Sequence, residues 1–237
     1  MPSNLVRGVL AAFVACAFAA TALAADHEGH QQASQSIVLG KTPEYPESGC
    51  PAPEKCEVVA RVTGIQMMAA GIEHPFKAPQ SGQLVSYWLK LPALRSTQIR
   101  TFNGLFGGDP VARIAVLRRG KAGRFRLIRQ SANQPLRGDL GQRGRVRYRL
   151  AAPLRVKEGD YIGLTAVTWV PAFAVNLDAA GNSWLASRPK QFERYYKRND
   201  AQLQSSTVKQ YVCSYQTARL LYWARIVPDV PAGTSGR

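Results

Sequence analysis

The sequence predicts an all-β protein, a single β-sandwich with flexible N- and C-terminal tails. Apolar and polar side chains alternate in several short runs, as in Arg145-Val146-Arg147-Tyr148-Arg149-Leu150, and a period of two is typical of half-buried strands. Turn residues separate these runs at modest intervals, which favours a sandwich or barrel. The 213 residues that remain after an N-terminal leader suit one domain with a proper core.

The alternation places strands between clusters of Gly, Pro, Asp and Asn that are typical of turns. The stretch 94–106 is open to interpretation as a short helix or an excursion, and 189–204 is polar and loop-like. The last strand region is open to division into two strands near Gln216. The predicted strands cover 56–63, 83–91, 111–118, 124–127, 145–150, 161–169, 172–177 and 210–227.

The two ends of the chain have compositions unlike the middle. Residues 1–24 have the pattern of a removable signal peptide. Arg7 is followed by an apolar run over 8–24, which ends in Ala22-Leu23-Ala24. A retained membrane anchor and a lipid anchor on Cys16 are the alternatives. We expect a flexible polar tail over 25–49, in which 37–39 could dock as an edge strand. The sandwich then spans 50–227, and 228–237 is predicted to be a disordered tail.

Export removes Cys16 and leaves three cysteines in a disulfide-permissive compartment. Cys50 and Cys56 flank a Pro-rich loop that brings them close, so a disulfide between them is predicted. Cys213 lies in a strand-like run and is expected to be a buried thiol. An intermolecular disulfide through Cys213, or its pairing with one of the other two cysteines, remains an alternative.

Residues 146–169 resemble the late strands of jelly-roll domains in secreted proteins, where a strand leads to the Pro-Leu-x-Val-Lys-x-Gly-Asp pattern seen at 153–160. The chain from Cys50 to about Val227 is similar to uncharacterised secreted proteins of actinobacteria. The shared motifs are Gly64-Ile65-Gln66, Leu105-Phe106-Gly107-Gly108 and Tyr215-Gln216-Thr217-Ala218-Arg219-Leu220. This resemblance implies a jelly-roll-like sandwich and an extracellular location, and it implies no activity and no catalytic residues.

The formal net charge is +16, and loss of Arg7 with the leader leaves +15. Such a charge concerns partners more than fold. If the two alternating strands are neighbours in one sheet, five arginines cover one exposed face and attract an anionic cell-wall polymer: Arg124, Arg126, Arg145, Arg147 and Arg149. An ordinary solvated sheet surface is the simpler interpretation. Specific nucleic-acid binding is not expected, because no aromatic-plus-basic recognition motif occurs.

Glycan binding is the second hypothesis, because sugars stack on exposed aromatic rings. Trp184, Tyr195 and Tyr196 stand in loop-like context and are the predicted ligand-binding residues. The remaining tryptophans are in strand-like context and are expected to pack in the core: Trp88, Trp169 and Trp223.

Cleavage after Ala24 would place His27 third in the mature chain, where the free amine and imidazole can bind Cu(II) or Ni(II) in a square plane. Cleavage after Ala25 would abolish that motif. No cofactor is expected. The sequence lacks the common hydrolase, metalloprotease and nucleotide-binding motifs. The nearest paired carboxylates, Glu158 and Asp160, lie in a predicted turn, and His74 is expected in a turn or in packing.

The sequence therefore predicts a secreted or cell-envelope, non-catalytic sandwich protein without a transmembrane anchor in its mature form. The expected partner is a glycan or an anionic wall polymer. A structural or assembly protein of the envelope is the alternative function, and an extracellular enzyme of unrecognised type is a further one. The oligomeric state stays open.

Overall fold

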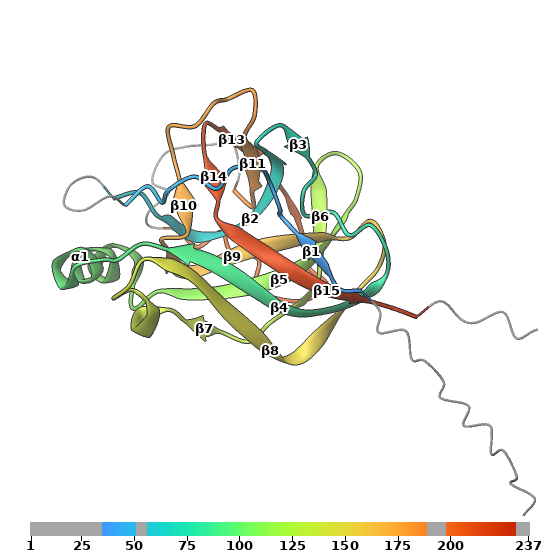
Figure 1. The fold of residues 1–237 in the computed structure, drawn as a ribbon, viewed down its shortest axis with the longest axis horizontal. Coiled ribbons are helices and arrows are strands. Elements are labelled where there is room, and N and C mark those ends of the chain that lie inside the picture. The colour runs from blue at the N-terminus through green and yellow to red at the C-terminus, as the bar shows by residue number, and fades with distance from the viewer. Residues whose placement is uncertain (1–34, 51–55, 189–197, 231–237) are drawn as a thin grey trace, which may run out of the picture. The chain divides into compact units, whose positions relative to one another are not determined.

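The computed structural model describes residues 35–50, 56–188 and 198–230. Within these ranges the protein is almost entirely antiparallel β-structure, which confirms the predicted all-β sandwich (Figure 1). The smaller sheet has four strands in the order β1-β15-β4-β8. These strands are β1 (Ile37–Leu39), β15 (Tyr222–Pro228), β4 (Gly82–Leu91) and β8 (Gly144–Val156).

The larger sheet has nine strands and follows the path β12-β6-β5-β9-β2-β11-β13. Along this path the strands are β12 (Val208–Gln210), β6 (Arg124–Gln130), β5 (Val111–Arg119), β9 (Tyr161–Val170), β2 (Val59–Ala69), β11 (Ser183–Ala186) and β13 (Cys213–Gln216). Two short strands pair off the path, β3 (Ile72–Glu73) with β2 and β7 (Gln134–Pro135) with β5. A separate pair joins β10 (Phe173–Ala174) to β14 (Arg219–Leu220).

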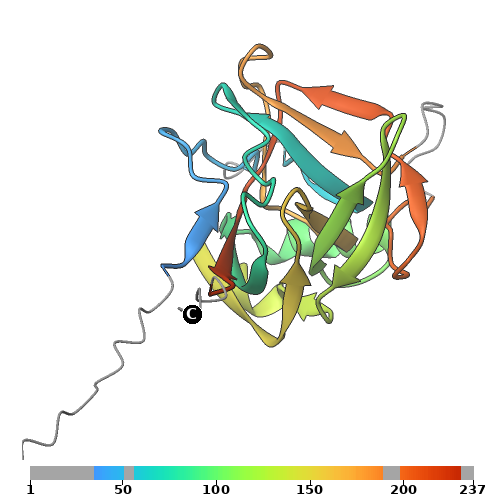
Figure 2. The same ribbon diagram turned by 90° about the vertical axis from the view of Figure 1, so that its right-hand side faces the viewer.

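The chain passes repeatedly between the two sheets, since β15, β4 and β8 are spatial neighbours but distant in sequence. One crossing, from β4 to β5, contains the helix α1 (Ser96–Phe106), and a short 3₁₀ turn (Arg137–Asp139) precedes β8. Figure 1 shows α1 at one end of the strands, with β15, β4 and β8 in front of β9 and β5. Figure 2 gives the view at right angles, in which β1 and the last strands of the larger sheet lie on opposite sides.

The core lies between the sheets, and period-two alternation explains which residues enter it. In β8, Tyr148 is buried while the three arginines around it are exposed. Trp169 is fully buried, as expected, and its indole Nε1 donates to Asn103 Oδ1 at 3.1 Å and to Gly108 O at 3.0 Å. Other core members include Leu84, Leu89, Ile114, Val116, Ile162, Leu164, Tyr222 and Ile226.

The sandwich begins earlier in the chain than residue 50, where its N-terminal boundary was expected. Residues 37–39 pair with β15 as an edge strand, which the sequence had offered as a possibility. The following segment is held by Arg219, whose guanidinium donates to Thr42 Oγ1 at 2.7 Å and to Glu44 O at 3.1 Å. The described part of the predicted tail, from residue 35, therefore belongs to the sandwich. The leader and residues 231–237 lie outside the described residues.

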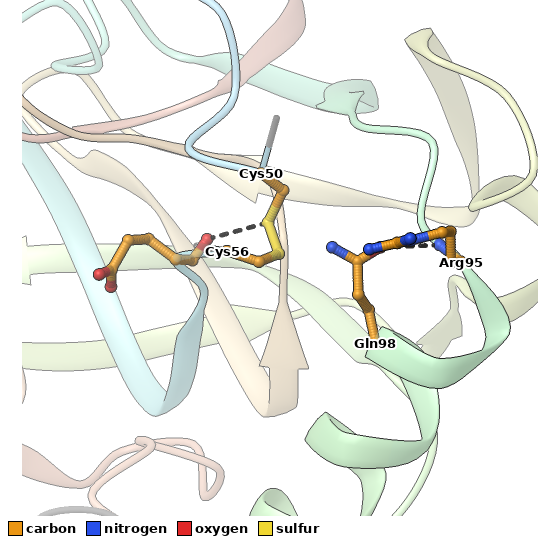
Figure 3. The surroundings of a disulfide bond; sticks show 5 residues. Cys50, Cys56, Arg95 and Gln98 are labelled. Atoms are coloured by element: carbon orange, nitrogen blue, oxygen red, sulfur yellow. Dashed lines mark hydrogen bonds between the residues drawn. A yellow bond between two sulfur atoms is a disulfide. The ribbon is translucent and has the colours of Figure 1, made fainter. Parts of the chain in front are cut away.

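The predicted disulfide joins Cys50 to Cys56 (Figure 3). Figure 3 also shows the start of α1, where Gln98 Oε1 accepts a hydrogen bond of 2.9 Å from the backbone N–H of Arg95. A native disulfide indicates a non-reducing compartment. Cys213 is 4% exposed, which confirms the buried thiol and corrects the alternative pairing with Cys50 or Cys56.

None of the helices in the described part of the chain is long and apolar enough to span a membrane.

Candidate functional site

The outer face of the smaller sheet gathers cationic and aromatic side chains from three strands. Strand register places Arg147 of β8 beside Trp88 of β4, and Trp88 beside Trp223 of β15. The rows on either side pair Arg145 with Lys90, and Arg149 with Ser86 and then Arg225. We call this surface the cationic face, and it consists of Ser86, Trp88, Lys90, Arg145, Arg147, Arg149, Trp223 and Arg225.

Trp88 and Trp223 lie on the outer face of the sheet; the expectation of burial is wrong for Trp88, which is partly exposed, whereas Trp223 is buried as expected. Their strand neighbours Tyr87, Leu89 and Tyr222 belong to the core cluster, so the alternate residues must point the other way. Trp88 is half-buried. Trp223 is only 2% exposed, because other side chains cover it from the solvent side.

Arg145 lies over the Trp223 ring, and Arg145 and Arg147 both lie over the Trp88 ring. The guanidinium carbon of Arg145 reaches across β4 and lies 4.9 Å from the centroid of the Trp223 ring and 5.7 Å from that of Trp88. The guanidinium carbon of Arg147 lies 5.2 Å from the Trp88 centroid. Such cation–π contacts favour the side-chain rotamers that keep each guanidinium over a ring. The tryptophan pair is therefore a platform for two arginines.

The face contains two buried hydrogen-bond donors that lack an acceptor among the described residues. Arg147 Nη2 donates to Ser86 Oγ at 3.3 Å. Arg225 of β15 pairs with Ser86 of β4, and its buried Nε has no acceptor among the described residues. The buried Nε1 of Trp223 also has no acceptor among these residues. Buried donors normally have partners, so these two are exceptions to the usual pairing.

One end of the face is covered by residues 43–48, which we call the strap. Lys90 Nζ donates to Pro46 O at 3.0 Å and to Glu47 Oε1 at 2.8 Å. The hydrogen bond from Lys90 holds the pKa of Glu47 below its usual value. Tyr45 is 42% exposed and its ring centroid lies 5.4 Å from that of Trp223. The strap thus neutralises Lys90 and shields one edge of Trp223.

The remaining cations of the face have no acidic partner. Across the described residues, no ion pair involves Arg145, Arg147, Arg149 or Arg225. Arg145, Arg147 and Arg149 of β8 are exposed. The cationic face therefore carries four positive charges without an acidic partner among the described residues, three on β8 and one on β15.

The five arginines predicted to share a face are divided between two sheets. Arg124 and Arg126 are exposed on β6, in the larger sheet, whereas the other three predicted arginines belong to β8 in the smaller one. The condition that both strands are neighbours in one sheet is thus not met, because β6 pairs with β5 and β12, and β8 pairs with β4. The alternation was identified correctly, but alternation alone does not determine which strands pair.

Trp184 lies in strand β11 and not in a loop. It is 3% exposed, its ring stacks on Tyr215 with centroids 4.5 Å apart, and its edge meets Phe173. It lines a pocket of about 1180 Å³ together with Phe173, Tyr215 and Arg188. Burial raises the pKa of the Tyr215 hydroxyl. Because Trp184 is already stacked, it offers no open ring surface to a sugar.

The other predicted ligand residues, Tyr195 and Tyr196, lie outside the described residues, as does the candidate metal ligand His27. Within residues 35–50, 56–188 and 198–230 no group of three potential metal ligands occurs.

Two further residues considered for catalysis have structural partners. Asp160 is 1% exposed and accepts two hydrogen bonds from Arg118, at 2.7 and 2.9 Å, and one from the backbone N–H of Lys157. His74 Nδ1 lies 3.3 Å from the Tyr161 hydroxyl and its backbone has a positive φ of 49°. Both residues support turns at the ends of strands.

Sequence reasoning missed the functional placement of Trp88, Trp223 and Arg225. Each tryptophan is flanked on both sides by apolar residues, in Tyr87-Trp88-Leu89 and in Tyr222-Trp223-Ala224. The residues directly next to each tryptophan therefore do not show which of them faces outward. The available clue was Lys90, two residues after Trp88, and Arg225, two residues after Trp223, because residues at i and i+2 share a face. Both clues place the tryptophans on a polar surface.

The comparisons with known proteins add no relative: no family model, no curated protein and no solved structure matches this chain. The similarity to secreted actinobacterial proteins stays a prediction.

Proposed function

We propose that this protein is an exported, non-catalytic binding protein that holds an anionic polymer of the cell envelope on its cationic face. The observation that carries the proposal is the tryptophan platform, on which Arg145 and Arg147 are stacked without acidic partners. A purely solvating surface needs no such platform, because unpaired arginines are soluble without it. The leader predicted at 1–24 and the disulfide Cys50–Cys56 support export.

Stacking makes the arginines better ligands in two ways. A long side chain loses rotamer freedom when it binds a partner, at a cost of about 0.5–1.5 kcal/mol. Arg145 and Arg147 should lose less rotamer freedom on binding a ligand, because their contacts with the indole rings already restrict them. No carboxylate in the described part of the chain pairs with either arginine, so no ion pair between those residues has to break.

The whole molecule assists the approach of an anion. The formal net charge, +15 after the predicted loss of Arg7 with the leader, produces a positive potential around the protein, which raises the rate of encounter with polyanions. The cationic face directs that attraction to one place, since three of its guanidinium groups come from β8 and the fourth comes from β15, on the other side of β4 in the same sheet.

Retention on purified cell wall tests the proposal. We expect the protein to bind wall that keeps its anionic polymers at about 0.05 M salt, to be released by about 0.5 M salt, and to ignore wall stripped of those polymers. The triple variant Arg145→Gln/Arg147→Gln/Arg149→Gln should lose most of this retention.

The matched control is Arg119→Gln/Arg124→Gln/Arg126→Gln, which removes the same charge from exposed positions on β5 and β6 of the other sheet. It should retain binding close to that of the unmodified protein. Equal losses in the two triple variants would mean that net charge alone governs retention, and would refute a binding site on the cationic face.

A further inference from the structure

We propose that the strap is an autoinhibitory cover of the cationic face, in which the carboxylate of Glu47 occupies Lys90 until a polyanion displaces it. This inference rests on the proposed function and concerns the regulation of the same site. It follows from where the strap is anchored, from what its middle contacts and from how exposed that contact is.

Both ends of the strap are fixed outside the smaller sheet, on the paired strands β10 and β14. On β14, Arg219 is 4% exposed and its guanidinium donates to Glu44 O at 3.1 Å. On β10, the carbonyl of Phe173 accepts a hydrogen bond of 2.6 Å from the backbone N–H of Gly49, which precedes the disulfide-bonded Cys50. These anchors do not involve the cationic face, so they can persist when the middle of the strap moves.

The middle of the strap is held by one cation of the face. Lys90 Nζ donates to Tyr45 O at 3.4 Å, to Pro46 O at 3.0 Å and to Glu47 Oε1 at 2.8 Å, and the ring of Tyr45 contacts Trp223. The three strap residues form no backbone–backbone hydrogen bond within the described part of the chain. Pro46 and Glu47 also line the pocket of about 1180 Å³, so the strap borders open space there. Lys90 therefore acts as the latch of the strap.

The latch coincides with a position that can bind an anion. Lys90 of β4 lies directly opposite Arg145 of β8 in the strand register. The side chain of Lys90 is only 17% exposed, whereas that of Glu47 is 68% exposed, and an ion pair at such an exposed carboxylate is weak. A polyanion bound at Arg145 holds its further anionic groups near Lys90 at a high effective concentration, which allows them to displace one carboxylate. Displacement would add a fifth cation to the four arginines of the face.

Titration calorimetry with long-chain inorganic polyphosphate at about 0.05 M salt tests the inference. We expect Glu47→Gln to bind about two- to threefold more tightly than the unmodified protein, a small gain because an exposed ion pair competes weakly. The matched control is Glu44→Gln, which removes the same charge from the same strap at an exposed carboxylate that forms no ion pair among the described residues. It should change the affinity by less than about 1.3-fold, because it frees no cation of the face.

A second background separates competition for Lys90 from the effect of net charge. In Lys90→Gln, the same Glu47→Gln substitution should change the affinity by less than about 1.3-fold, because the cation for which the carboxylate competes is absent. A gain of about two- to threefold in that background would mean that Glu47 acts through net charge alone, and would overturn the inference. Near-ultraviolet circular dichroism of each variant reports whether the fold is intact.

The outcomes distinguish this inference from the proposed function. A gain from Glu47→Gln that disappears in the Lys90→Gln background supports the autoinhibitory strap. If the unmodified protein binds polyphosphate and Glu47→Gln binds it no more tightly, or if Glu44→Gln gains as much, the inference is overturned while polyanion binding stands. If neither the unmodified protein nor Glu47→Gln binds polyphosphate, the proposed function itself fails.

Discussion

The stacking of Arg145 on Trp223 gives a quantitative prediction, because the two side chains can be altered separately. Their separation is 4.9 Å, and Trp223 is almost completely shielded from water. Cation–π contacts contribute about 0.5–1 kcal/mol at exposed sites and about 2 kcal/mol when desolvated. Arg145 is exposed on its other side. We therefore expect a coupling free energy of about 1 kcal/mol between the two residues.

A double-mutant cycle with Arg145→Met and Trp223→Leu measures this coupling, since both substitutions keep apolar bulk while removing the charge and the ring face. Urea unfolding followed by far-ultraviolet circular dichroism gives the four free energies of unfolding. The matched control cycle uses Arg149→Met with Trp223→Leu, because no ring contact joins Arg149 to Trp223 among the described residues. That control should give at most about 0.3 kcal/mol, and equal coupling in the two cycles would refute the stacking argument.

Three other perturbations have defined outcomes. Cys50→Ser/Cys56→Ser should lower the free energy of unfolding by about 2.4 kcal/mol, because the disulfide closes a short loop. Scanning calorimetry should show a fall in Tm of about 5–10 °C. An unchanged Tm would contradict this expectation. The affinity for the polymer, measured by calorimetry, should vary less than about twofold between pH 5.5 and 8.5. The ionisable groups of the cationic face are arginine and lysine, which stay protonated over this range. A steep fall in affinity above pH 7 would point to another site. Glu47→Gln should destabilise by no more than about 0.5 kcal/mol at pH 7, because this exposed carboxylate pairs with Lys90. The pKa of Glu47 is lowered in the folded protein, so the contact stabilises above the ordinary glutamate pKa and is lost as pH falls through the lowered one. The difference between the variant and the unmodified protein in urea unfolding should therefore vanish near pH 3.

Local patterns predicted the strands well where polar and apolar residues alternate. Arg145–Leu150 lies in β8 with its arginines outward, and the break expected near Gln216 separates β13 from β14. The same reasoning failed for Trp184, because a Gly-Asn-Ser turn pattern precedes it and β11 has only four residues. A strand that short shows too little alternation to distinguish it from a loop.

The sequence by itself determined the secondary-structure class, the short disulfide loop and the outward direction of the arginines in β8, since each depends on residues within a few positions of one another. Only the tertiary structure decided that β6 and β8 belong to different sheets, and that β8 lies beside β4 and β15. The pairing of β4 with β8 and with β15 joins segments more than 50 residues apart, which a local period of two does not encode. The cationic face exists because that pairing brings Arg145 and Arg147 over two tryptophans from different strands.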